Sequence, residues 1–148
     1  MNSLHFSIRT ADAVHILILI ALSQEPVCSR EIAAGIASSP NHVRSLMSLL
    51  SKAGIIESSQ GKAAGQIALP AEKITMLSVC QSMEKGVPLL HLNTHVNEQC
   101  ATGMCIQHAL QNCFDDIQKK FEEELEGITL ADLFDLYRKE LQKNPPGV

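Results

Sequence analysis

The stretch SREIAAGIASSPNHVRSLMSLLSKAGIIE, residues 29–57, decides the fold that this sequence predicts. It holds a short apolar-patterned segment, a Ser-Ser-Pro turn and a longer patterned segment that ends at Gly54. A Gly-rich stretch and then Ile67-Ala68-Leu69 follow. A short helix, a tight turn, a second helix and a hairpin, in that order, are typical of a winged helix-turn-helix, which places its second helix in the DNA major groove.

Capping residues set the predicted ends of these two helices. Gly35 falls near the end of the first helix, where the turn can begin. Ser39 is a strong N-cap residue, and Pro40 follows at the first helical position, where its missing N–H costs nothing. Gly54 ends the second helix as a residue that tolerates the left-handed conformation. One face of the first helix carries Ile32, Ala33, Ile36 and Ala37 at helical spacing.

The second helix has one apolar face and one polar face. The apolar stripe consists of Val43, Leu46, Met47, Leu50 and Ala53. The polar face carries side chains that suit phosphates and base edges, and the N-terminal ones would meet bases first. The predicted DNA contacts are Ser29, Arg30, Ser39, Asn41, His42, Arg44, Ser45 and, in the wing, Lys62. Arg44 is the candidate for reading a guanine with two hydrogen bonds.

A hairpin after Gly54 forms the predicted wing. Residues 55–58 and 66–69 are its strands, and residues 61–65 are its turn. Lys62 at the tip is the natural phosphate contact. The wing would lie along the adjacent minor groove.

Composition and charge narrow the class of nucleic acid. Aromatic residues make up only 3% of the 148 residues, which argues against recognition of single strands by base stacking. The net charge is −4, but it divides into +1 over residues 1–70 and −5 over residues 71–148. DNA affinity must therefore come from a few specific side-chain contacts and from dimerisation rather than from a large positive electrostatic potential.

The sequence shows neither a signal peptide nor a membrane span. Its most apolar run, residues 13–22, is interrupted by His15 and is shorter than the roughly 20 residues that a span needs. Five cysteines without a secretory signal point to a reducing cytoplasm and to thiol or metal roles.

The rest of the chain is predicted to be helical. The expected helices cover residues 7–23, 75–84, 103–126 and 129–141, and residues 87–103 are irregular. The long helix carries an apolar seam, and pairing with its copy in a two-fold homodimer would bury it. The predicted organisation is a DNA-binding domain at 1–85, a sensor loop at 86–103 and dimerisation and C-terminal helices at 104–148. The fold class is mainly α with a small β-wing.

This order resembles the Rrf-type family of bacterial winged-helix transcription regulators, which includes the iron–sulfur cluster regulator. The resemblance covers essentially the whole chain and rests on residues 32–33, 43–56, 70–77 and 128–133. It implies a homodimeric regulator, most often a repressor, that binds a palindromic site on double-stranded DNA. The wing departs from the family pattern Arg-Gly-x-x-Gly-Gly, because Gln60 stands in place of the arginine.

Three interpretations of the cysteines stay open. Many family members hold an iron–sulfur cluster with three cysteines before the long helix; here Cys100 and Cys105 correspond to two of them, and Thr94 and His95 stand at the first. Cys100, Cys105 and a histidine such as His108 could hold a cluster or another metal. Alternatively, Cys100 is a redox thiol that Cys105 resolves into a disulfide. In the third interpretation the cysteines are small apolar fillers, as we expect for Cys28 and Cys80.

Two other classes of protein are weighed against a regulator. A winged helix can serve protein–protein assembly alone, and the weak basic charge of residues 1–70 fits that role. A thiol- or metal-dependent enzyme is the other alternative, but no Gly-rich phosphate loop, carboxylate pair or Ser-His-Asp order supports it. A DNA affinity that falls steeply with salt would separate a regulator from both.

Overall fold

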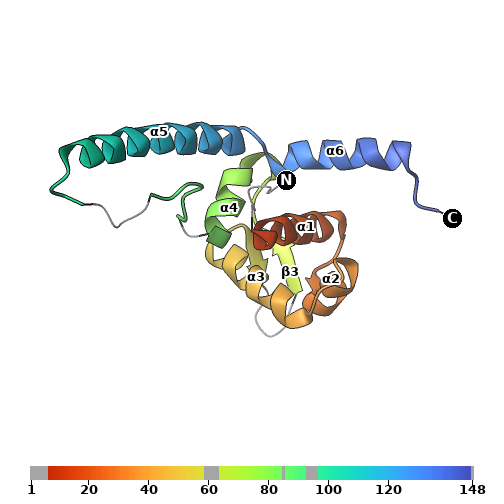
Figure 1. Ribbon diagram of the computed structural model, residues 1–148. Helices are drawn as coiled ribbons and strands as arrows, with labels where there is room; N and C mark the ends of the chain where they lie inside the picture. Colours follow the sequence, from red (N-terminus) through yellow and green to blue (C-terminus); the bar gives the residue numbers. More distant parts are fainter. Residues whose placement is uncertain (1–6, 59–63, 85, 93–96, 148) are drawn as a thin grey trace.

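A compact head lies beneath an extended bar made of two helices in the computed structural model of the chain (Figure 1). The structure describes residues 7–58, 64–84, 86–92 and 97–147. The elements between residues 8 and 84 form the head, and the two helices between residues 101 and 143 form the bar. The elements are α1 (Ile8–Leu22), β1 (Val27–Cys28), α2 (Ser29–Gly35), α3 (Pro40–Lys52), β2 (Ile56–Ser58), β3 (Ala64–Ile67), the short 3-10 turn η1 (Ala71–Lys73), α4 (Met76–Glu84), α5 (Ala101–Glu126) and α6 (Leu130–Lys143).

One hydrophobic core holds the head together, and α1 lies at its centre. Ala13, Ile16 and Leu17 of α1 are fully buried, as the apolar run at residues 13–22 predicts. Helices α3 and α4 pack on α1. The core residues contributed by the other elements are Ile32, Ala33, Val43, Leu46, Met47, Leu50, Ile55, Ile56, Ile74, Val79, Met83 and Leu130. Most of the apolar positions predicted for residues 29–54 therefore point inward, whereas Ala37, which follows the end of α2, and Ala53, the C-cap residue of α3, are exposed.

The helix-turn-helix forms where the capping pattern predicts it. Ser39 caps α3, since its Oγ accepts a hydrogen bond from the His42 N–H at 3.2 Å. Gly54 follows the helix with φ +74°, a left-handed conformation that glycine adopts without steric cost. The turn between α2 and α3 differs from the prediction in one respect. Gly35 is the last residue of α2, and the left-handed residue is Ala37, with φ 51°.

The wing is part of a three-stranded antiparallel sheet in the order β1-β3-β2. Strand β1 was not predicted, because it has only two residues and forms only by pairing with the distant strand β3. In that pairing Val27 lies opposite Gly65. Gly65 lets β3 approach the helices closely. A Cβ atom at this position would lie 2.7 Å from Cε of Met47 and 3.2 Å from Cδ1 of Ile20. Residues 61–63 of the expected turn, Lys62 included, lie outside the described residues. Ala64 and Gly65, expected in the turn, instead begin β3, which ends at Ile67, two residues earlier than expected.

The bar is joined to the head through a short antiparallel bridge. Thr75 pairs with Thr129, and the N–H groups of Met76 and Leu130 donate to the carbonyls of Ile128 and Ile74, each at 2.8 Å. Figure 1 shows α5 and α6 extending to opposite sides of this point. Helix α5 begins at Ala101, two residues earlier than expected, because Cys100 caps it. Among the described residues, no helix is long and apolar enough to cross a membrane.

Candidate DNA interface and cysteine segment

The polar face of α3 is exposed because its opposite face is fully engaged in the core. Val43, Leu46 and Leu50 have no exposed surface, so rotation of the helix about its axis is fixed. Asn41, Arg44 and Ser45 are consequently exposed on the outer face. An Arg44 guanidinium nitrogen donates a hydrogen bond to the Asn41 side-chain oxygen, so these two residues form one surface unit. Both residue types make the two-hydrogen-bond contacts by which proteins read purines in the major groove.

His42 is directed toward α1 rather than outward. Its Nε2 lies 3.0 Å from Oδ2 of Asp12, and both side chains are largely buried, with 35% and 26% of their surface exposed. This contact ties the first turn of α3 to α1. Asp12 is a residue that the sequence analysis missed, since nothing in the local pattern links positions 30 residues apart. A DNA contact by His42 remains a prediction, and it would have to coexist with the Asp12 contact.

The remaining predicted DNA contacts occupy different environments. Arg30, on α2, is exposed. Ser29 is only 4% exposed, so its side chain has almost no surface to offer to DNA. The Ser39 hydroxyl is engaged in capping α3. Lys62 lies outside the described residues. The candidate DNA interface within the described residues therefore consists of Asn41, Arg44 and Ser45 on α3 and of Arg30, which is exposed on the preceding helix.

Cys100 has a defined place at the start of α5. It is the N-cap residue, and its Sγ accepts a hydrogen bond from the Gly103 N–H at 3.3 Å. Its side chain is exposed, and so are those of Cys105, His108 and Cys113. Cys105 lies five residues further along, a rise of about 7.5 Å and a rotation of about 140°. A disulfide with Cys100 needs Cα atoms within about 7 Å, so the first turn of α5 would have to open.

These residues do not form a complete metal site within the described part of one protomer. No group of three or more His, Cys, Asp or Glu side chains there is arranged to hold a metal ion. Cys105 and His108 share one helix face, but Cys100 points elsewhere because of the 140° rotation. The implied iron–sulfur cluster therefore does not fit the described donor set. His95, the other candidate, lies outside the described residues.

The two cysteines expected in the core are only half-buried. Cys28 precedes α2, and its backbone N–H donates to Oε2 of Glu31 at 2.9 Å, closing a capping box. That hydrogen bond lowers the pKa of Glu31. Cys80 lines a cavity between α4 and α5. The expectation that both cysteines are core residues fails, because Cys28 is at the edge of the sheet and Cys80 borders a cavity that also contains carboxylate groups.

Taken together, a capped helix with a buried apolar face, an exposed Asn–Arg unit and a following antiparallel sheet defines a winged helix-turn-helix protein. The family model described as Rrf2, iron-dependent transcriptional regulator, matches residues 6–136. The chain belongs to this family. Rrf2 members are transcriptional regulators and not enzymes, which removes the enzymatic alternative.

Individual relatives agree with this assignment. The chain is 34% identical over 125 residues, 84% of its length and 93% of the relative's, to YwnA of Bacillus subtilis (strain 168), which carries the name HTH-type transcriptional regulator. A crystal structure of a protein described as DNA-binding is 32% identical and has a TM-score of 0.72, covering 85% of this chain and 98% of that one.

More distant solved structures share the fold. CymR, the global cysteine regulator of B. subtilis, is 20% identical with a TM-score of 0.66, covering 88% of this chain and 96% of its own. IscR of T. potens is also 20% identical with a TM-score of 0.66, covering 97% of this chain and 93% of its own. At this identity, the likeness concerns the winged-helix fold alone.

Proposed function

We propose that the protein is a homodimeric, sequence-specific DNA-binding repressor that reads a palindromic operator with α3. The observation that carries this proposal is the geometry of α3, whose fully buried stripe leaves the Asn41–Arg44 unit on the outside of a winged helix. Such a helix can enter the major groove of B-DNA, which is about 12 Å wide. The family membership supports a role in transcription.

The dimer is proposed from α5. Ile106, Leu110 and Ile117 lie on one stripe of this 26-residue helix and are 56%, 41% and 39% exposed. A contiguous exposed apolar stripe is costly in water, and a second copy of the same helix would bury it in a self-complementary contact. A dimer also explains how a head with a charge near +1 reaches useful affinity, because two heads bind one operator together.

The function test is a DNA titration at several salt concentrations. Operator sequences are first selected from random duplexes, and affinity is then measured by fluorescence anisotropy. We expect preference for a palindrome over a scrambled duplex, and a logarithmic affinity that falls linearly with the logarithm of salt concentration. Binding without sequence preference or without salt dependence would contradict the proposal and leave the protein–protein assembly module as the better reading.

Control of DNA binding is proposed to act through Cys100. The incomplete metal donor set in the described residues favours a thiol over a cluster. In this scheme the exposed Cys100 thiolate attacks a hydroperoxide, the O–O bond breaks, sulfur is oxidised to sulfenic acid and the peroxide is reduced with release of hydroxide or alkoxide. The product lies at the cap of α5, where Gly103 donates to sulfur, so its formation changes the start of the dimerisation helix.

The oxidation test compares Cys100→Ser with Cys113→Ser. Cys113 is equally exposed but lies in the middle of α5, so its replacement serves as the matched control. We expect peroxide to change the DNA affinity of the unmodified protein and of Cys113→Ser, and to leave Cys100→Ser unaffected. Iron and sulfide analysis of protein purified without oxygen tests the cluster alternative. Stoichiometric iron and sulfide would overturn the thiol scheme without affecting the DNA-binding proposal.

A further inference from the structure

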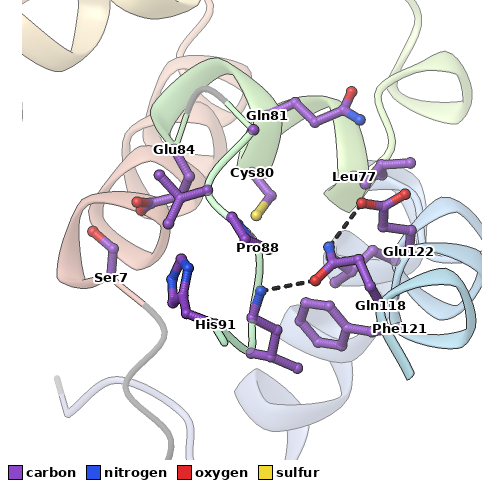
Figure 2. Close-up of a pocket in the computed structure, with 14 residues that line it drawn as sticks. Ser7, Leu77, Cys80, Gln81, Glu84, Pro88, His91, Gln118, Phe121 and Glu122 are labelled. Atoms are coloured by element: carbon purple, nitrogen blue, oxygen red, sulfur yellow. Dashed lines mark hydrogen bonds between the residues drawn. The ribbon is translucent and has the colours of Figure 1, made fainter. Parts of the chain in front are cut away.

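A cavity of about 360 Å³ lies between α4, the segment 86–91 and the C-terminal half of α5 (Figure 2). Its volume is within the range of small-molecule sites, about 300 to 1,000 Å³. Part of its wall is apolar and comes from Leu77, Val87, Pro88, Leu89, Phe121 and Leu125. The cavity therefore has the size and the apolar surface that an organic ligand requires.

Hydrogen bonds hold the wall of the cavity in place. The Leu89 N–H donates to Oε1 of Gln118 at 2.7 Å, and Nε2 of Gln118 donates to Oε1 of Glu122 at 2.8 Å. Figure 2 shows this chain running from the segment 86–91 across to α5. On the other side, the Thr10 hydroxyl, which is only 2% exposed, donates to Oε1 of Glu84 at 3.2 Å. Two carboxylates are thus fixed in the wall by neutral donors.

The charge of the cavity wall is negative, because its lining includes two carboxylates, Glu84 and Glu122, and one imidazole, His91. No lysine or arginine among the described residues forms an ion pair with either carboxylate. The Cys80 thiol adds no charge at neutral pH, since burial, and then the nearby Glu84 carboxylate, raise its pKa. The cavity therefore offers two anionic acceptors beside an apolar surface.

The arrangement of these groups selects an organic cation over a metal ion. Glu84 and Glu122 lie on opposite sides of Cys80 and Pro88 in Figure 2. Among the described residues, no three carboxylate, thiol or imidazole groups converge well enough to hold a metal. A metal ion needs such convergence, whereas an extended molecule can place a charged group at one end and an apolar group along the wall.

We propose that this cavity binds a small amphipathic organic cation, namely a primary ammonium ion carrying an aromatic or branched aliphatic group. The ammonium group donates hydrogen bonds to one of the two glutamate carboxylates and is attracted by the negative charge of the other, and the apolar group packs among Leu77, Phe121 and Leu125. Charge-assisted hydrogen bonds of this kind are stronger than neutral ones, and the ring of Phe121 adds an attractive surface for a cation.

The position of the cavity suggests a consequence for DNA binding. Helix α4 packs against α1 and α3 in the head and against α5 in the bar. The face of α5 that lines the cavity is rotated about 100° from the exposed stripe Ile106–Leu110–Ile117. A ligand therefore contacts both parts without competing directly for the proposed dimer stripe. This consequence rests on the proposed function, whereas binding of the cation does not.

Calorimetric titration of the full chain with phenethylamine tests the proposal. Phenethyl alcohol and hydrocinnamate are the neutral and anionic controls of similar shape. We expect saturable binding of the amine, with both controls at least about tenfold weaker. Glu122→Gln and Glu84→Gln should each weaken amine binding about tenfold, and Glu123→Gln, on the opposite face of α5, should not.

Alkylation of Cys80 locates the bound probe. We expect phenethylamine to slow the reaction of Cys80 with iodoacetamide, read by peptide mass spectrometry, and to leave the exposed Cys100 unprotected. Absence of saturable amine binding, equal affinity for hydrocinnamate, or unprotected Cys80 would each overturn the proposal. All three results come from the unmodified protein, so they test the cation proposal even if a glutamate variant fails to fold. They also hold whether or not the protein binds DNA.

Discussion

Arg44 and Asn41 are three residues apart on the exposed face of α3, and their side chains are hydrogen-bonded to each other. This pairing holds the guanidinium close to the helix N-terminus, the part of a recognition helix that meets base edges. The neighbouring His42 contributes in another way, through its contact with Asp12 of α1. At the scale of single residues, the start of α3 thus has an exposed pair placed for the proposed base readout and a second pair that links α3 to α1.

We predict that Arg44→Ala weakens operator binding by about 1–3 kcal/mol and relaxes the preference for one base pair, because a two-hydrogen-bond contact to guanine is lost. Competition anisotropy against single-base variants of the selected operator measures both effects. Arg30→Ala is the comparison: as a phosphate contact, its loss should weaken binding to all sequences alike. Unchanged affinity and specificity in Arg44→Ala would exclude this residue from base readout.

At the scale of elements, capping residues define where the helices begin and end. Helix α3 is defined by Ser39 at one end and by Gly54 beyond the other. Helix α6 begins with a capping box, in which Asp132 Oδ2 accepts from the Thr129 N–H at 2.8 Å. The start of α6 adjoins the Thr75–Thr129 bridge. Its capping therefore also supports the connection between the bar and the head.

Removal of the α3 cap should lower the free energy of unfolding. We predict a loss of about 1 kcal/mol in Ser39→Ala, because the His42 N–H loses its hydrogen-bond acceptor. Urea denaturation followed by circular dichroism measures this loss. Ser48→Ala, on the exposed middle of the same helix, is the control and should change stability little. Equal effects of the two substitutions would show that the cap is not the cause.

The α6 cap should depend on pH. The hydrogen bond from the Thr129 N–H lowers the pKa of Asp132 below its ordinary value of 3.8. The charged carboxylate is favoured in the folded helix, so its contribution is complete above the ordinary pKa and is lost as the pH falls through the lowered one. We predict that the amide protection factors at the start of α6, corrected for the intrinsic exchange rate at each pH, decrease as the pH falls below about 4, and that Asp132→Asn shows no such change. A titration of Asp132 by NMR at or above 3.8 would contradict this.

At the scale of the whole molecule, α5 has two distinct faces. One of its faces forms the cavity with α4, and the stripe beside it stays exposed in a single protomer. The loop between α4 and α5 and the cap at Cys100 connect these features to the head. A change at the cavity or at Cys100 therefore acts on the helix that would set the spacing of two DNA-binding heads.

We predict that Ile117→Asp converts the dimer into monomer at micromolar concentration, because two buried carboxylates would face each other across the two-fold axis. Sedimentation equilibrium measures the mass, and anisotropy should show that operator binding weakens at the same time. Asn112→Asp adds the same charge on the opposite face of α5 and should leave the mass unchanged. A dimer that survives Ile117→Asp would exclude this stripe as the interface.

The sequence by itself determined the helices of this protein and the order in which they follow one another. Ser39, Gly54, Thr75 and Thr129 act on backbone groups a few residues away, and the apolar spacing in α1, α3 and α5 reflects the geometry of a single helix. Such signals are local, so the expected helix bounds agree with the structure within about two residues. The order of these segments also predicted the winged helix-turn-helix, which the structure confirms. The family resemblance added the homodimer, which stays a prediction.

Only the tertiary structure decided which distant residues meet. The pairing of Val27 with Gly65, the contact of His42 with Asp12 and the cavity bounded by Cys80, Glu84 and Glu122 join segments 30 or more residues apart. The burial of Ser29 and the separation of Cys100 from Cys105 likewise depend on how whole helices lie. Local propensity carries no information about these contacts, because they arise from packing the apolar faces of all the elements at once.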